Sequence, residues 1–138
     1  MSSSLNNTIE ELENEYWGVP AKNSTTLVSR IHELRKKPLK DFTIEDLRIV
    51  IGQSFSLGLL IPLAIEELKQ NILAEGDFFE GDLLINVLNA DVNYWKLHHN
   101  QWLIIKALVE ANKALFEEKK HRQILKGFKK FEQVYTIK

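Results

Sequence analysis

Four histidines are the side chains best suited to metal binding or acid–base catalysis in this chain: His32, His98, His99 and His121. Two histidines bind one metal from a helix when they are three or four residues apart, because only then do both rings leave the same face. His98 and His99 are adjacent, so on a helix they point about 100° apart. We expect one ring to pack beside the neighbouring tryptophans and the other to face solvent. The histidines therefore predict no metal site.

Other kinds of catalytic chemistry are equally poorly supported. The chain has no cysteine, and it contains no phosphate-binding glycine loop, dinucleotide fingerprint or serine nucleophile elbow. The acidic residues of segment 75–82 lack the alternating carboxylate spacing of a calcium loop. The glutamates between residues 10 and 15 are typical of an exposed helix face rather than of an acid catalyst. We therefore expect no enzymatic activity, no cofactor and no small-molecule substrate.

Charge is concentrated in three blocks, although the net charge is only −1. Residues 22–40 and residues 113–138 each have a local charge of +5, whereas residues 66–82 have −5. Such blocks are most often solvated surface, and they can also steer a charged partner. The last block mixes aromatic residues with lysines, a pattern that also occurs in nucleic-acid binding. An alternative function is thus a helical nucleic-acid-binding or regulatory module that uses this basic tail, although an isoelectric point near 6.4 disfavours nucleic acid as the partner.

The elements that must position these residues are all predicted to be helices. We expect an all-α fold: a compact single-domain bundle of about five to seven helices over residues 8–138. Residues 1–7 are polar and expected to fray, and the basic tail 117–138 is expected to form a further helix after Gly127. A stripe of Trp95, Trp102, Val109 and Phe116, each seven residues apart, predicts one long, core-facing helix in the C-terminal half.

Local helix signals mark where several of these helices begin. Thr8 and Thr43 are each followed three residues later by an acidic residue, which predicts two capping boxes. Asp82 is expected to cap a short helix, and Pro62 is expected in the first turn of a buried helix over residues 59–73. No apolar run approaches the roughly 20 residues of a membrane span, and the N-terminus lacks the pattern of a secretory signal. These features favour a cytoplasmic protein without membrane contact.

The most informative stretch is KKPLKDFTIEDLRIVIGQ at residues 36–53. Three further blocks accompany it in order: TIEELENEYWG at residues 8–18, LIPLAIEEL at residues 60–68 and NILAEGDFFEGDLL at residues 71–84. Together these blocks resemble the immunity proteins of bacterial contact-dependent growth inhibition systems over about residues 8–95. The segment from about residue 98 to residue 138 is not typical of that family.

The resemblance implies an all-α immunity protein that captures a cognate toxin C-terminal domain, often a nuclease, in a stoichiometric complex without catalysis. An acidic surface can then mimic nucleic-acid phosphates and speed association. The apolar residues of the 36–53 block are expected to maintain the fold. The candidate toxin-binding residues are Glu66, Glu67, Glu75, Asp77, Phe78, Phe79, Glu80 and Asp82. Of Phe78 and Phe79, we expect at least one to fill the core, because large apolar side chains are more often buried than exposed.

Overall fold

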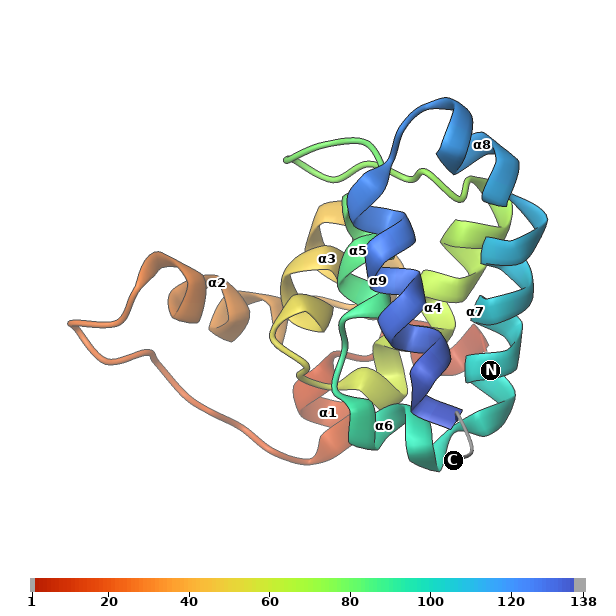
Figure 1. Cartoon of the computed structure of the whole chain (residues 1–138). Coiled ribbons are helices and arrows are strands. Elements are labelled where there is room, and N and C mark those ends of the chain that lie inside the picture. Colours follow the sequence, from red (N-terminus) through yellow and green to blue (C-terminus); the bar gives the residue numbers. More distant parts are fainter. Residues whose placement is uncertain (1, 136–138) are drawn as a thin grey trace.

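The computed structural model describes residues 2–135, and Figure 1 shows their arrangement. The fold is all-α, as predicted, and no strand occurs in this part of the chain. In chain order the elements are the 3-10 helix η1 (Ser2–Asn6), α1 (Ile9–Glu13), α2 (Thr26–Leu34), the 3-10 helix η2 (Leu39–Asp41), α3 (Ile44–Gly52), α4 (Leu57–Gln70), α5 (Asp82–Leu88), α6 (Val92–Leu97), α7 (His99–Ala111), α8 (Lys113–Glu118), α9 (Arg122–Glu132) and the 3-10 helix η3 (Gln133–Tyr135).

Helices α3, α4 and α5 pack against one another at the centre, where α9 covers α5 and α7 covers α4 (Figure 1). The apolar residues of the 36–53 block belong to this core: Leu47, Val50 and Ile51 are buried, and Phe42 packs against them. Removal of their apolar surface from water stabilises the fold. The prediction that these residues maintain the fold is therefore confirmed.

The predicted long helix in the C-terminal half is wrong, because α6, α7 and α8 take its place. His98 has non-helical backbone angles (φ −133°, ψ 58°), and its Nδ1 lies 2.7 Å from the carbonyl oxygen of Tyr94. Asn112 ends α7 and donates its side-chain amide to the carbonyl of Leu108. Side chains that bond to the nearby backbone in this way compete with helix continuation. The stripe itself is nevertheless buried, as expected, on three helices: Trp95, Trp102, Val109 and Phe116.

This division also explains why the described part of the chain has nine α-helices rather than five to seven. Helix α9 is the further helix in the basic tail, but it begins at Arg122, so Gly127 lies inside it. Helix α4 begins at Leu57, which puts Pro62 inside the helix rather than in its first turn. Where the sequence predicts fraying at the N-terminus, η1 forms and Leu5 packs against the core.

Both capping boxes are confirmed. The Thr8 hydroxyl accepts from the Glu11 amide while Glu11 accepts from the Thr8 amide, and Thr43 and Asp46 form the same reciprocal pair. Helix α2 follows an extended stretch of chain at the edge of the molecule (Figure 1) and packs against α3, with Ile31 and Leu34 buried. Only some of its apolar residues are buried, because Leu27 and Val28 are exposed.

None of the helices in residues 2–135 has the length and apolar content that a membrane crossing requires.

Candidate interaction site

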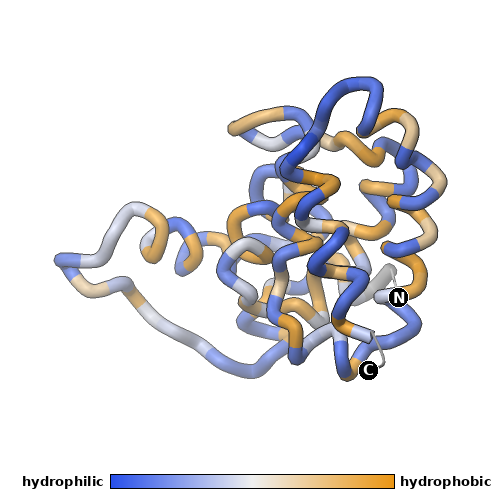
Figure 2. Tube along the Cα trace, in the orientation of Figure 1, coloured by the Kyte–Doolittle hydropathy of each residue, from blue (hydrophilic) through white to orange (hydrophobic). Residues whose placement is uncertain are grey.

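The segment between α4 and α5 ends in a loop whose tip is both acidic and aromatic. We call residues 75–82 the acidic loop. Glu75, Asp77, Phe78 and Phe79 are all exposed, with 68% of Phe78 and 42% of Phe79 accessible to solvent. Figure 2 shows a hydrophobic stretch at the protruding tip of this loop. The expectation that at least one phenylalanine fills the core is therefore wrong.

Asp82 holds the acidic loop in shape. Its carboxylate is buried and accepts hydrogen bonds from three loop amides: Gly76 at 2.7 Å, Phe78 at 3.0 Å and Phe79 at 3.3 Å. Asp82 therefore bonds backward to the loop and does not cap α5, which corrects the sequence-based expectation. Gly81 occupies the N-cap position with a φ of +85°, a conformation that glycine adopts without a steric penalty. Among the candidates, Asp82 supports the site and presents no surface to a partner.

Helix α3 supports the other side of the acidic loop. The Glu45 carboxylate accepts from the Asp77 amide at 2.8 Å and from two guanidinium nitrogens of Arg48 at 2.7 and 2.6 Å. The Arg48 hydrogen bond lowers the pKa of Glu45, burial opposes this shift, and the Asp77 amide adds to it. A Cβ atom at Gly76 would lie 2.4 Å from the Glu45 carboxylate, so this close approach requires glycine.

Arg48 also fixes the aromatic tip. Its guanidinium lies 4.1 Å from the centroid of the Phe78 ring, and its Nε is 3.8 Å from the Asp82 carboxylate. A cation is attracted to the face of an aromatic ring. The Arg48 guanidinium therefore holds Phe78 in place through one face of its ring, while most of the side-chain surface stays exposed. Sequence reasoning missed the roles of Glu45 and Arg48. Their spacing of three residues on a helix was the available signal, since such pairs form ion pairs.

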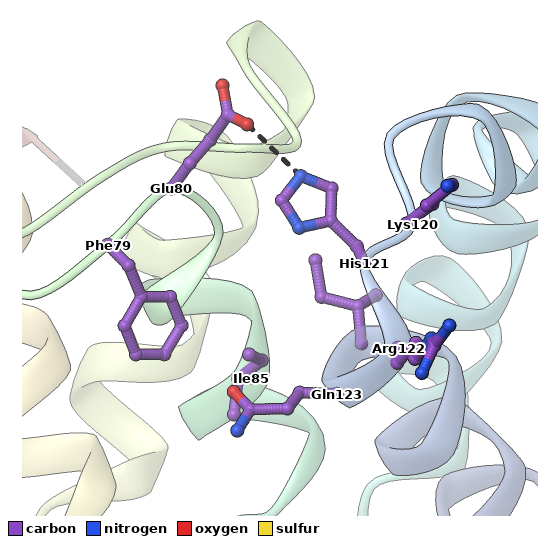
Figure 3. Close-up of a pocket in the computed structure, with 8 residues that line it drawn as sticks. Phe79, Glu80, Ile85, Lys120, His121, Arg122 and Gln123 are labelled. Carbon is purple, nitrogen blue, oxygen red and sulfur yellow. Dashed lines mark hydrogen bonds and ion pairs between the residues drawn. The ribbon is translucent and has the colours of Figure 1, made fainter.

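Glu80 joins the acidic loop to the basic tail. Its carboxylate lies 3.3 Å from Lys119 Nζ and 3.1 Å from His121 Nε2, and Figure 3 shows the contact with His121. The hydrogen bond from Lys119, followed by that from His121, lowers the pKa of Glu80. Of the candidate carboxylates, Glu80 is thus already paired, whereas Glu75 and Asp77 form no side-chain hydrogen bond or ion pair with other described residues.

The remaining candidates, Glu66 and Glu67, lie on α4 before the loop begins. Glu66 is paired with Lys69 of the same helix at 3.4 Å. The structure therefore gathers residues 75–80 at one tip and leaves these two glutamates on a different element.

The four histidines do not come together at one place: His121 contacts Glu80, His98 stacks on Tyr94, and His99 packs against Tyr135. Within residues 2–135, no group of three or more potential ligand side chains could hold a metal ion.

The arrangement is one of recognition chemistry. A loop whose backbone is hydrogen-bonded to Asp82 and Glu45 presents two aromatic rings and two unpaired carboxylates, and exposed aromatic residues are common anchors of protein interfaces. Comparison with known proteins adds a family: the family model described as CDI immunity proteins matches residues 11–105. This range includes the acidic loop and α3 and ends inside α7. Searches of curated proteins and of solved structures gave no match.

Proposed function

This chain belongs to the CDI immunity proteins, and on that premise we propose that it neutralises a cognate nuclease toxin domain by binding it stoichiometrically through the acidic loop. The function requires no catalytic step and is exerted in the cytoplasm, where such a toxin acts. The observation that carries the proposal is the exposed Phe78, whose ring contacts Arg48 and which follows the unpaired carboxylates of Glu75 and Asp77 on the acidic loop.

The chemistry of the acidic loop suits the substrate-binding face of a nuclease. Such faces are basic because they bind phosphates, and carboxylates at the loop tip supply the same charge. The loop backbone is already hydrogen-bonded to Asp82 and Glu45, so little conformational entropy is lost when it binds. Complementary charge also accelerates the encounter, which protects a cell before the toxin cleaves nucleic acid.

The proposal is tested by co-purification with the toxin domain encoded immediately upstream, followed by growth of cells that express both. We expect a 1:1 complex and restored growth. The double variant Glu75→Lys, Asp77→Lys should lose at least tenfold in affinity, because it presents like charge to a basic surface. Phe78→Ala should weaken binding by roughly 30-fold, as expected for a central aromatic anchor.

Matched control variants separate the loop from general charge effects. Glu66→Lys combined with Glu67→Lys changes the net charge equally, but on α4. We expect it to change affinity less than threefold. Equal losses in the loop and α4 variants would reject the loop as the centre of the interface. The absence of any complex or rescue with the wild-type chain would reject immunity against that toxin.

A further inference from the structure

A groove begins at the acidic loop and follows the line between α5 and α9. Its first hollow, of about 370 Å³, is lined by Phe79, Ile85 and Gln123 among others (Figure 3). A second hollow of about 300 Å³ shares Ile85 and Gln123 with the first and continues past Asn89. Both helices are packed against each other below it. The exposed ring of Phe79 therefore belongs to the acidic loop and to the groove at once.

The rim of the second hollow is cationic. Lys126 and Lys130 line it, one helical turn apart on α9, and both are exposed. Neither forms an ion pair or a hydrogen bond with another residue in the described part of the chain. Lysines at this spacing share one face of a helix, so their charges point along one edge of the groove. The groove wall also has the side-chain amides of Asn89 and Gln123, which likewise have no partner among the described residues.

We propose that this groove binds an extended acidic segment of the same toxin domain that the acidic loop binds, so the inference rests on the proposed function. Lys126 and Lys130 pair with the carboxylates of the segment, while Asn89 and Gln123 bond to its backbone. Residues 122–130 of α9 span about 12 Å, which is the length of about four extended residues. The partner surface is thus bipolar, with a basic region for the loop and an acidic segment beside it.

A peptide fits this groove better than a nucleic acid does. Of the acidic-loop carboxylates only Glu80, already paired with Lys119 and His121, lines the groove. A nucleic-acid strand has a phosphate at every nucleotide, and its charge would be repelled by the unpaired Glu75 and Asp77 of the same loop. A peptide can place carboxylates beside the two lysines and neutral residues beside the loop. The shared Phe79 makes one partner for both surfaces the simplest occupant. Helix α9 also lies outside the matched range 11–105, where a feature specific to one toxin is expected.

The test uses the full chain and the toxin domain encoded immediately upstream, with affinity measured by calorimetry. Lys126→Glu combined with Lys130→Glu should weaken the complex at least tenfold. Lys126→Arg combined with Lys130→Arg keeps the charge and should stay within twofold. The control, Lys22→Glu combined with Lys40→Glu, changes the net charge equally at two exposed lysines outside the groove and should stay within threefold. Far-UV circular dichroism establishes that each variant is folded.

Direct contact is measured by carbodiimide cross-linking, which joins lysine amines to adjacent carboxylates without a spacer. We expect links from Lys126 or Lys130 to aspartates or glutamates within one short toxin segment, and their loss in the arginine variant. A stable complex with no such links, or with affinity unchanged by the glutamate pair, would reject the groove assignment and leave the acidic loop intact. No complex at all with the wild-type chain rejects the proposed function, and the groove assignment with it.

A ten-nucleotide oligouridine serves as the competing ligand. Its failure to bind, or binding that the glutamate pair leaves unchanged, agrees with a peptide groove. Binding that the glutamate pair abolishes, together with unchanged affinity for the toxin, would overturn the assignment and identify a nucleic-acid surface instead.

Discussion

Two segments of this chain have the same local charge of +5, residues 22–40 and residues 113–138, yet their cations are in opposite situations. In the first, carboxylates of the N-terminal helices pair with four of the six basic residues: Arg30 and Lys37 with Asp46, Lys36 with Glu10, and Arg35 with Glu13. In the described part of the second, Lys119 pairs with Glu80, but Lys126 and Lys130 pair with nothing. Equal charge in the sequence therefore produces a structural network in one place and a free cationic edge in the other.

The difference follows from what each segment packs against. Residues 22–40 lie beside α1 and α3, whose first turns contain acidic residues because carboxylates favour helix N-termini. Helix α9 lies against the apolar side of α5, so its lysines face solvent. A cation bound to a buried carboxylate contributes to stability, whereas an unpaired surface cation contributes mainly to recognition. Four measurements distinguish a structural cation from a free one.

The largest effect is expected for Asp46→Ala. This carboxylate is fully buried, completes the capping box of α3 and binds both Arg30 and Lys37. Loss of the cap costs about 1 kcal/mol, and loss of the charge-assisted bonds adds more, although both cations can return to water. We expect the free energy of unfolding in urea to fall by about 2–4 kcal/mol. The control is Asp41→Ala, at an exposed carboxylate. A similar fall in the free energy of unfolding there would show that the buried contacts of Asp46 add no stability.

The next largest effect is expected on the pH dependence of stability, when wild type and Asp46→Asn are compared. In the wild type, burial opposes ionisation of Asp46, but hydrogen bonds from Lys37, the Thr43 amide and Arg30 outweigh it and lower its pKa below 3.8. A carboxylate whose pKa is lowered in the folded state contributes stability at pH values above the pKa it has in the unfolded chain. This contribution is lost as the pH falls through the folded-state pKa. Stability of the wild type should therefore drop more steeply than that of Asp46→Asn below about pH 4. Parallel curves would contradict this role.

Two single lysine substitutions compare the segments directly. Lys37→Ala removes a 2.6 Å contact with a buried carboxylate and should cost about 1 kcal/mol. Lys126→Ala removes no contact of this kind and should change the free energy of unfolding by less than about 0.5 kcal/mol. Both are measured by urea denaturation under the same conditions. Equal costs would remove the distinction between a structural and a free cation.

The smallest effect on stability is expected at the contact between the acidic loop and the segment before α9. Glu80→Gln weakens the contacts with Lys119 and His121, which lie before the first turn of α9. Because the Glu80 side chain is 43% exposed and its partners are also on the surface, global stability should barely change. Amide hydrogen exchange should instead accelerate locally over residues 119–123. Unchanged exchange there would show that the acidic loop and α9 are positioned independently.

Much of the local structure could be predicted from the sequence. The capping boxes at Thr8 and Thr43 and the buried stripe from Trp95 to Phe116 are all found. These features depend on residues three to seven apart, whose relation is set by helix geometry. The two breaks in the predicted long helix could not be predicted in this way. They occur where the side chains of His98 and Asn112 bond to the backbone of the preceding turn, and neither hydrophobic spacing nor helix propensity indicates these bonds.

The candidate site could be predicted only in part. Five of its eight residues are gathered on the acidic loop in positions that a partner can reach: Glu75, Asp77, Phe78, Phe79 and Glu80. The other three are Asp82, which is buried, and Glu66 and Glu67, which lie on α4. The supports Glu45 and Arg48 were missed because they are about 30 residues away in sequence from the loop that they hold.

Composition, short-range spacing and ordered blocks of residues were enough to predict the all-α class, the starts of α1 and α3, and the family. Which charges are free follows from the tertiary packing. The same carboxylate or lysine is a buried support, a neutralised partner or an exposed contact according to which distant element lies beside it. Burial and pairing at such distances depend on the packing of the whole chain, so the acidic loop and the cationic edge of α9 became visible only in the folded molecule.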